Sequence, residues 1–410
     1  MKQVDIIRPC SINAIVGPIG TLKRILKNKD YFIDRGYEPS LFVNESISLQ
    51  RPIELSDIKV PSTGSKKSSF KGRLYSKLSL WGKHVYPLAC WLMNNYYKVT
   101  ERLNDFYISL SRTPDIVEFH SEMDCYYYLK SRKEHTAKTV VFLHSDGIPF
   151  AMNLVYYPCL INSRYYRNVW KKIEWTMEHV DKIVFIAQKG QDNFLKLFPN
   201  VDPAKTFVML NGIDDLTETQ YKEVEEIRSR HYEFKYRLCC TGTINTRKGH
   251  LYIIEALNRI PKDKLANIHV DFLGEGPQRM VLEDLVNRYG LEKHVNFYGS
   301  VPNVKVYRYL SEENIYILMS ENEGLPISII EAMRAGLPII STKVAGIPEI
   351  VKEGYNGLLL QPSTDELVPI LESLDEYDWN DMGKKSRFRF EKELTFDRMR
   401  KDFCDMFDSL

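Results

Sequence analysis

Residues 321–336 read ENEGLPISIIEAMRAG, and the rest of the chain is best understood by working outward from this stretch. Pro326 suits the first position of a helix, because its missing N–H would have no partner there. Gly336 can end the helix in the left-handed conformation. The stretch therefore predicts a loop followed by a helix, with unbonded N–H groups and the positive dipole end at residues 324–328. A helix start of this kind binds phosphate readily.

Two glutamates flank the predicted phosphate position. Glu331 lies about one and a half turns into the helix, where its carboxylate can accept hydrogen bonds from two vicinal hydroxyls, such as those of a ribose. Glu323 lies in the loop ahead of the helix and can hold a sugar on the other side of the phosphate. The pattern favours a nucleotide sugar laid across the helix start. Glutamates at this spacing also occur in ordinary helices, so the interpretation depends on the surrounding sequence.

The composition indicates a soluble globular protein. The chain has 410 residues, of which 44% are hydrophobic and 27% charged, and its formal net charge is +2. The length favours two domains, and the small net charge gives no general attraction to nucleic acid. The seven cysteines show no metal-ligand spacing, so we expect reduced thiols, no metal site and a cytoplasmic location. We find no signal peptide and no apolar run long enough to span a membrane.

Strands and helices alternate through the first half of the chain, which predicts an open parallel sheet. It opens with a strand, a loop containing Gly17 and Gly20, a helix to Arg35 and a second strand. Two later strands end in His120 and His144. Residues just past the carboxyl ends of such strands line the ligand crevice, so His144 is a candidate site residue, whereas a structural role is equally open for His120. These later strands are expected at residues 115–120, 139–144, 182–187 and 206–210, with helices at 161–180 and 188–198.

Residues 66–98 combine lysines and an arginine with interleaved aromatic and aliphatic side chains, and they contain no acidic residue. This composition is typical of a segment that lies on an anionic membrane surface. The plain alternative is a solvated basic loop followed by a helix packed on the domain. Nucleic acid is a third alternative, which the small net charge of the chain disfavours.

A second series of strands and helices follows the polar residues 216–234, which we interpret as the connection between two domains. Loops containing glycine follow several of the new strands and mark the edge of a second ligand crevice. Arg247 and Lys248 lie in the first of these loops, where their cations suit a diphosphate. An ordinary surface turn would explain the same two residues. The strands are expected at residues 236–241, 268–273, 295–298, 314–319, 338–341 and 357–360.

Several motifs of the second half resemble those of the family 4 glycosyltransferases. They are NGID at 211–214, GTINTRKGH at 242–250, GEGPQR at 274–279, FYGSV at 297–301, YNGLLL at 355–360 and, above all, the stretch 321–351. The resemblance is strongest from residue 211 to residue 362 and continues more loosely back to residue 4. It implies an α/β fold of two facing Rossmann-like domains with an interdomain cleft, known as the GT-B architecture.

The implied domains are an acceptor-side domain at 1–212, with a basic and aromatic insertion at 56–112, and a nucleotide-sugar-binding domain at 213–385. A helix at 386–410 would cross back to the first domain. Family members are retaining, metal-independent enzymes that use nucleotide sugars as donors and need no further cofactor. The resemblance implies a hexosyltransferase, with a UDP-linked donor favoured over a GDP-linked one.

The expected acceptor is a glycan or lipid-linked molecule in the assembly of a bacterial-type surface polysaccharide, with the enzyme in the cytoplasm or on the inner face of the cell membrane. Two alternatives remain open: a soluble or protein acceptor, and a non-catalytic subunit that binds a nucleotide sugar.

The matching positions imply roles for individual residues. Glu331 would hold the ribose, Glu323 the hydroxyls of the donor sugar, and Lys248 the diphosphate, while His144 would lie near the anomeric centre. His144, Lys248 and Glu323 are thus the predicted catalytic residues. The other predicted contacts with the nucleotide sugar are Gly17, Gly20, Arg247, Ser300, Val301, Gly324, Leu325, Pro326 and Ser328.

Thr243 departs from the family pattern. An arginine commonly follows the glycine at this point and pairs with the lysine on the diphosphate. Losing one charge-assisted contact costs about 1.5–3 kcal/mol. Arg247 is the candidate to compensate; without compensation the chain would be a weak or inactive member.

Overall fold

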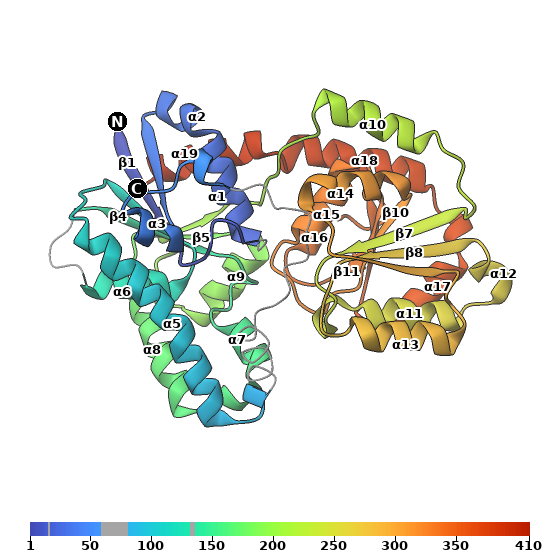
Figure 1. Ribbon diagram of the computed structural model, residues 1–410, viewed down its shortest axis with the longest axis horizontal. Helices are drawn as coiled ribbons and strands as arrows, with labels where there is room; N and C mark the ends of the chain where they lie inside the picture. Colours follow the sequence, from blue (N-terminus) through green and yellow to red (C-terminus); the bar gives the residue numbers. More distant parts are fainter. Residues whose placement is uncertain (15–16, 59–80, 132–135) are drawn as a thin grey trace. The chain divides into compact units, whose positions relative to one another are not determined.

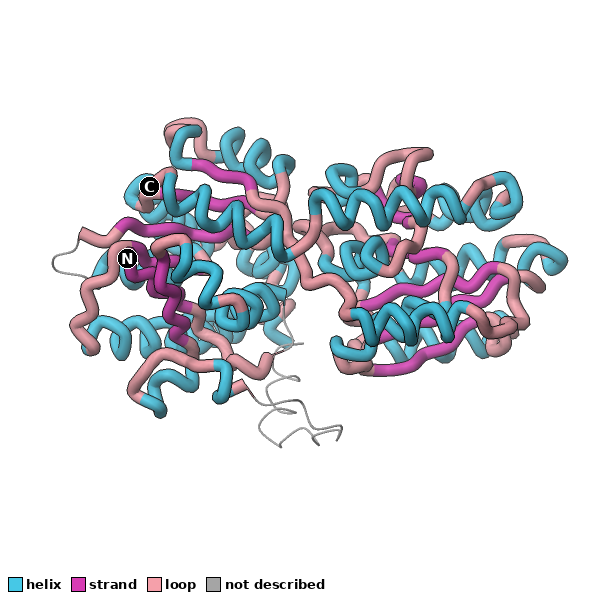
Figure 2. Tube along the Cα trace, turned by 90° about the horizontal axis from the view of Figure 1, so that it is seen from above, coloured by secondary structure: helices cyan, strands magenta, loops and turns pink. Residues whose placement is uncertain are grey.

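The computed structural model describes residues 1–14, 17–58, 81–131 and 136–410. These residues form two compact units, and Figure 2 shows the strands of each unit enclosed by helices. The N-terminal unit contains Met1–Met209 and Arg400–Leu410, and the C-terminal unit contains Leu210–Met399. Each unit is an α/β domain around its own parallel sheet, so the predicted fold class is confirmed.

The sheet of the N-terminal unit has the order β2-β1-β3-β4-β5-β6, with all neighbours parallel. Helices cover both faces of such a sheet, which explains why its strands read as nearly continuous apolar runs. The strand order reverses between β1 and β3, and ligand sites lie at such reversals, beyond the carboxyl ends of the strands. The strands are β1 (Lys2–Ile7), β2 (Tyr37–Phe42), β3 (Ile116–Phe119), β4 (Lys138–Leu143), β5 (Lys182–Phe185) and β6 (Thr206–Val208).

Helices α5, α6 and α8 pack together over one face of this sheet (Figure 1) and share a continuous apolar core with it. The last helix, α19, belongs to the unit from Arg400 onward. Its Phe403 ring lies 5.4 Å from the ring of Phe142 and 6.2 Å from that of Phe32, measured between centroids. The helices are α1 (Gly17–Lys27), α2 (Lys29–Asp34), α3 (Asn44–Leu49), α5 (Tyr86–Ser109), α6 (Glu122–Ser131), α7 (Ala151–Tyr156), α8 (Arg164–His179), α9 (Gln188–Leu197) and α19 (Phe396–Asp408).

The sheet of the C-terminal unit has the order β12-β11-β10-β7-β8-β9, again with parallel neighbours. This is the doubly wound order of dinucleotide-binding domains, in which the strand order reverses between β7 and β10. The crevice of this unit is therefore expected beyond the carboxyl ends of these two strands. The strands are β7 (Tyr236–Thr241), β8 (Ile268–Leu273), β9 (Val295–Gly299), β10 (Ile315–Leu318), β11 (Ile339–Thr342) and β12 (Gly357–Leu360).

Figure 1 shows α11 and α13 on one face of this sheet and α14, α15 and α18 on the other. The N-terminal ends of α11 and α15 follow β7 and β10, so both helices begin at the crevice edge. The helices are α10 (Glu218–Arg228), α11 (His250–Arg259), α12 (Lys262–Leu265), α13 (Arg279–Tyr289), α14 (Asn303–Glu312), α15 (Ile327–Arg334), α16 (Ile347–Ile350), α17 (Thr364–Glu372) and α18 (Trp379–Glu393).

The glycine loop predicted near the N-terminus is wrong. Gly17 is the first residue of α1, and Gly20 lies in its first turn. The helix expected to run to Arg35 is also interrupted, because Asn28 separates α1 from α2 and its side-chain amide donates to the carbonyl of Arg24 at 2.9 Å. Asn favours such positions because its side chain competes with the backbone for hydrogen bonds.

Residues 216–234 do not connect the two units. They contain α10, whose first turn is closed by Thr217 and Gln220, each side chain accepting a hydrogen bond from the other's backbone N–H. The buried side chains of Val224 and Ile227 fix this helix to the C-terminal unit. The polar composition of the segment reflects the exposed face of a surface helix, and the chain passes between the units at residues 209–210 instead.

The final segment, 386–410, forms parts of two helices rather than one. The N–H of Ile213 donates to the carbonyl of Leu394 at 3.0 Å, and the N–H of Phe396 donates to the carbonyl of Ile213 at 2.9 Å. Because these backbone groups are bonded to another segment, α18 cannot continue through them. Thr395 then begins α19 by accepting a hydrogen bond from the N–H of Arg398.

Candidate functional site

The loops that follow β7 and β10 meet at the reversal of strand order in the C-terminal unit. The N–H of Glu321 donates to the carbonyl of Arg247 at 2.8 Å, and the Arg247 guanidinium donates to the carbonyl of Asn322 at 2.6 Å. Asn245 shapes the first loop by accepting a hydrogen bond from the N–H of Lys248. Two segments that lie far apart in the sequence thereby form one edge of the crevice.

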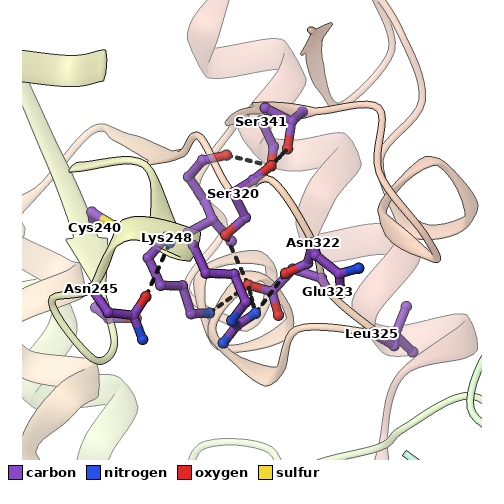
Figure 3. A network of polar contacts seen from close by, with 12 residues as sticks. Cys240, Asn245, Lys248, Ser320, Asn322, Glu323, Leu325 and Ser341 are labelled. Carbon is purple, nitrogen blue, oxygen red and sulfur yellow. Dashed lines mark hydrogen bonds and ion pairs between the residues drawn. The ribbon is translucent and has the colours of Figure 1, made fainter. Parts of the chain in front are cut away.

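Glu323 is the centre of a buried charge cluster at this edge (Figure 3). One of its oxygens, Oε1, lies 2.7 Å from Nζ of Lys248 and 2.9 Å from the guanidinium of Arg247, and it accepts a hydrogen bond from Ser320 at 2.8 Å. Glu323 and Lys248 are 7% and 8% exposed. Burial favours the neutral acid, but the fields of Lys248 and Arg247 outweigh it and lower the pKa of Glu323. The cluster is therefore a fixed carboxylate between two cations.

This arrangement can exchange one anion for another. A diphosphate brought to Lys248 and Arg247 would compete with the Glu323 carboxylate for the same cations. A carboxylate released in this way can accept hydrogen bonds from sugar hydroxyls. Thr243 is exposed, so the position that departs from the family pattern adds no cation, but the loop still brings Arg247 to the carboxylate as a second one.

Glycines allow the loops of this crevice to pack backbone against backbone. A Cβ on Gly249, where φ is +69°, would lie 1.9 Å from the carbonyl oxygen of Met319, which directly follows β10. A Cβ on Gly274 would lie 1.8 Å from the oxygen of Gly242. The glycines of the GTINTRKGH and GEGPQR motifs are therefore required by space as well as by backbone conformation.

We expect Gly249→Ala to lower the free energy of unfolding by more than about 4 kcal/mol, because the methyl group would overlap a buried carbonyl. Gly290 is the matched control: its φ is +67°, and a Cβ there would meet nothing within 4 Å. Gly290→Ala should cost only the left-handed strain, about 1–2 kcal/mol. Urea unfolding followed by circular dichroism measures both, and equal losses would contradict the steric explanation.

The helix start predicted as the phosphate site is confirmed as a helix start, with α15 beginning directly after Pro326. The N–H of Ile329 is bonded to the carbonyl of Pro326 at 3.1 Å, so the N–H groups of Ile327 and Ser328 precede the first bond of the helix. Leu325 is buried, and its carbonyl accepts a hydrogen bond from the side chain of Asn211 at 3.2 Å.

The remaining predicted residues of this unit lie on two elements. Gly324 is half-buried beside the helix start, and Glu331 is half-buried on α15. The apolar side of the same helix consists of the buried residues Ile329, Ile330, Ala332 and Met333. Ser300 and Val301 follow the edge strand β9, which β8 separates from β7.

In the N-terminal unit, His144 and His120 follow β4 and β3, and the structure brings them together. His120 Nδ1 lies 2.7 Å from His144 Nε2, and the Arg8 guanidinium donates to the carbonyl of His120 at 2.6 Å. Both imidazoles line a cavity of about 240 Å³. Among the described residues that line it, neither Gly17 nor Gly20 occurs, so their predicted contact with the ligand stays a prediction.

Sequence reasoning missed four residues that hold the predicted ones in place. Ser320 and Asn245 fix the charge cluster, and Arg8 and Glu118 surround the two histidines. Ser320 and Arg8 each lie just past the end of a strand, which is the signal that could have identified them. Glu118 lies inside a buried strand, where a charged residue is rare unless it has a specific partner.

Two family models together match most of the chain. One, described as Glycosyltransferase Family 4, matches residues 30–215, and the other, described as Glycosyl transferases group 1, matches residues 222–378. The chain belongs to the family 4 type of glycosyltransferases. The family resemblance drawn from the sequence motifs is thereby confirmed.

Individual relatives of this glycosyltransferase are distant. A phosphatidylinositol N-acetylglucosaminyltransferase of Arabidopsis thaliana is 22% identical over 55% of this chain and 52% of its own length. The putative colanic acid biosynthesis glycosyltransferase WcaL of Escherichia coli is 27% identical over 33% of this chain and 40% of its own length. The chain thus spans about half the length, or less, of these curated relatives.

Among solved structures, Anabaena HepE in complex with UDP matches with a TM-score of 0.67 at 16% identity, and each chain is fully covered. The same protein has been solved with UDP-glucose. At this identity the similarity concerns the fold, and it confirms the GT-B architecture for this glycosyltransferase.

Proposed function

We propose that the chain is a retaining hexosyltransferase that uses a nucleotide sugar, UDP-linked rather than GDP-linked, and transfers the sugar to a glycan or lipid-linked acceptor in the assembly of a surface polysaccharide. The observation that carries the proposal is the Lys248–Glu323–Arg247 cluster beside the start of α15, at the strand reversal of a dinucleotide-binding sheet. The names of relatives in polysaccharide and glycolipid assembly, and the UDP complexes of HepE, support it.

The proposed mechanism follows from where charge develops. Breaking the bond between the sugar and the nucleoside diphosphate leaves negative charge on the phosphate and positive charge on the anomeric carbon. Lys248, Arg247 and the first N–H groups of α15 are fixed donors that can accept the leaving phosphate without proton transfer. Glu323, displaced from the two cations, can hold hydroxyls of the donor sugar. Retention of the anomeric configuration is proposed from family membership.

The activity test uses the full chain with UDP-glucose, UDP-N-acetylglucosamine and GDP-mannose. We expect release of UDP in preference to GDP, first with water as acceptor and then faster with a polyprenyl-phosphate-linked saccharide. Nuclear magnetic resonance of the new anomeric proton reports retention or inversion. Binding of UDP, seen as a thermal shift, without release from any donor would favour the non-catalytic alternative.

A lipid-linked acceptor is favoured by an exposed surface at one end of the N-terminal unit, which we call the aromatic tip. It comprises the residues before and at the start of α5, the end of α7, and Ile161; its exposed apolar side chains include Trp81, at 71%, and Val155, at 58%. These segments lie together, because Gly82 accepts a hydrogen bond from Cys159 and lies against the ring of Tyr157. The further exposed members are Val85, Tyr86, Trp91, Tyr156 and Ile161.

The charge of the aromatic tip suits an anionic membrane. Residues 81–100 and 151–173 contain no acidic residue, and exposed cations among them include Lys83, Arg164 and Arg167. Residues 66–80 of the basic segment predicted from the sequence lie outside the described residues, whereas 81–98 contribute to the tip. No described helix has both the length and the apolar character required to cross a bilayer.

We expect the protein to float with vesicles containing phosphatidylglycerol and to be released by salt. The triple variant Lys83→Glu, Arg164→Glu, Arg167→Glu should bind at least about 100-fold more weakly, since each cation near the surface contributes about 1 kcal/mol. The control Met280→Ser, Val281→Ser changes an exposed apolar pair in the other unit and should bind as the parent does. Flotation that is absent, or unaffected by the triple variant, would favour a soluble or protein acceptor.

A further inference from the structure

A buried carboxyl group stands behind the two histidines of the N-terminal unit. Glu118, on β3, approaches Nε2 of His120 with its Oε1 at 2.9 Å, a contact without a straight N–H···O line. His120 Nδ1 in turn lies 2.7 Å from His144 Nε2. The two rings lie within 18° of parallel with centroids 5.0 Å apart, which places the two nitrogens face to face. The three side chains thus form a row from the sheet interior to the cavity wall.

The carboxyl end of this row lacks any group that would stabilise a negative charge. Glu118 is fully buried, and neither of its oxygens makes a hydrogen bond to another described residue. An ionised carboxylate in such a place is costly, so the neutral acid is favoured, and burial raises the pKa of Glu118 to about 8. Burial and the Arg8 cation lower the pKa of both imidazoles, so they are neutral as well.

The surrounding charges are paired among themselves. Arg8, from the end of β1, bonds the carbonyl of His120 and lies 3.8 Å from Asp124 of α6. Asp5, on the opposite face of β1, is bonded to Tyr107 and Arg112. Glu122, at the start of α6, is also raised in pKa by burial. The strand β4 contributes Phe142 beside the two imidazoles rather than a charge.

We propose that Glu118 is a positioning acid that, through His120, fixes the tautomer of His144, so that His144 presents its Nδ1–H to an oxygen of the ligand in the cavity. A neutral imidazole has one donor and one acceptor nitrogen. If the carboxyl O–H donates to His120 Nε2, the ring proton of His120 must be on Nδ1. It then donates to His144 Nε2, and the proton of His144 must be on Nδ1.

The same geometry permits the reverse direction when Glu118 is ionised. His120 then donates from Nε2 to the carboxylate, His144 donates from Nε2 to His120, and Nδ1 of His144 becomes an acceptor. One proton on Glu118 therefore decides whether His144 offers the ligand a donor or an acceptor. The oxygen that it would meet is a hydroxyl or ring oxygen of the sugar, and this identification rests on the proposed function.

The tautomer is read directly by nitrogen-15 resonance of the full chain labelled in histidine, with His144 assigned from a His144→Asn variant. Below the pKa of Glu118 we expect a proton on Nδ1 of His144, and above it a proton on Nε2. Glu118→Gln should abolish this change with pH, while Glu313→Gln, at another buried glutamate of raised pKa, should preserve it. A proton on Nε2 at neutral pH, or a change that survives Glu118→Gln, overturns the proposal.

Catalysis supplies the second readout. As pH rises through about 8, sugar transfer by the parent should fall, because His144 loses its donor; Glu118→Gln should lack this alkaline limb and Glu313→Gln should keep it. Glu118→Leu, which can neither donate nor accept, should lower kcat by at least about tenfold with little change in KM. An alkaline limb that persists in Glu118→Gln would contradict the role of Glu118. If no donor is turned over at all, the proposed function fails while the resonance test of the tautomer still stands.

Discussion

Lys248→Ala is expected to lower kcat by about 10²–10³-fold, the effect of removing one fixed donor from a developing oxyanion. The Lys248 amine is almost fully buried and is held in place by Glu323, so water cannot readily replace it. Arg247→Ala should have a smaller effect, about tenfold, because the Arg247 side chain is 23% exposed against 11% for Lys248 and its charge is better screened. Steady-state kinetics with the preferred donor separates kcat from KM.

Two controls distinguish charge from packing. Lys248→Met keeps the aliphatic stem that lies against Gly242, and it should be as slow as Lys248→Ala if the charge is what matters. Lys235→Ala removes an exposed lysine paired with Asp375 in the same unit and should leave kcat unchanged. A Lys248→Ala enzyme with normal kcat would remove the basis for the proposed stabilisation of the leaving phosphate.

Glu331→Gln is expected to weaken UDP binding by about 10–100-fold, because hydrogen bonds to a charged group contribute about 1.5–3 kcal/mol. The reason is positional: α15 buries its apolar side in the core and leaves Glu331 half-buried on another side. Its carboxylate can then accept from both ribose hydroxyls. Isothermal titration calorimetry with UDP measures the loss, and Glu366→Gln, at an exposed acid on α17, serves as the control.

The ribose assignment has a sharper test in a double comparison. The parent should lose affinity for 2′,3′-dideoxy-UDP relative to UDP, whereas Glu331→Gln should bind the two ligands almost equally. Independent losses that simply add would show that Glu331 does not contact the ribose hydroxyls. The prediction concerns binding alone and therefore holds even for a chain without transferase activity.

The sequence by itself determined the architecture. Apolar runs of strand length alternate with helical segments, and no compact arrangement other than two parallel sheets covered by helices buries them all. The glycine-containing loops and the Pro326 helix start also follow from sequence, because only particular residues tolerate those backbone conformations. The second β-strand series was located nearly to the residue for this reason.

Only the tertiary structure decided how the ends of elements are bonded. Whether residues 216–234 connect the units or form α10, and where the last helix breaks, depends on hydrogen bonds between segments distant in sequence, such as those of Ile213 with Leu394 and Phe396. Local propensity cannot register such partners. The same holds for Gly17 and Gly20, which suit a turn but lie in a helix.

The tertiary structure also decided which side chains meet. The motifs named Lys248 and Glu323 separately, but the reversal of strand order between β7 and β10 places them 2.7 Å apart and adds Arg247 and Ser320 to the same carboxylate. Glu118 gave no local signal of its own. Its consequence arises because neighbouring parallel strands end together and a buried charge must be neutralised where it lies, and both conditions are set by packing rather than by the order of residues.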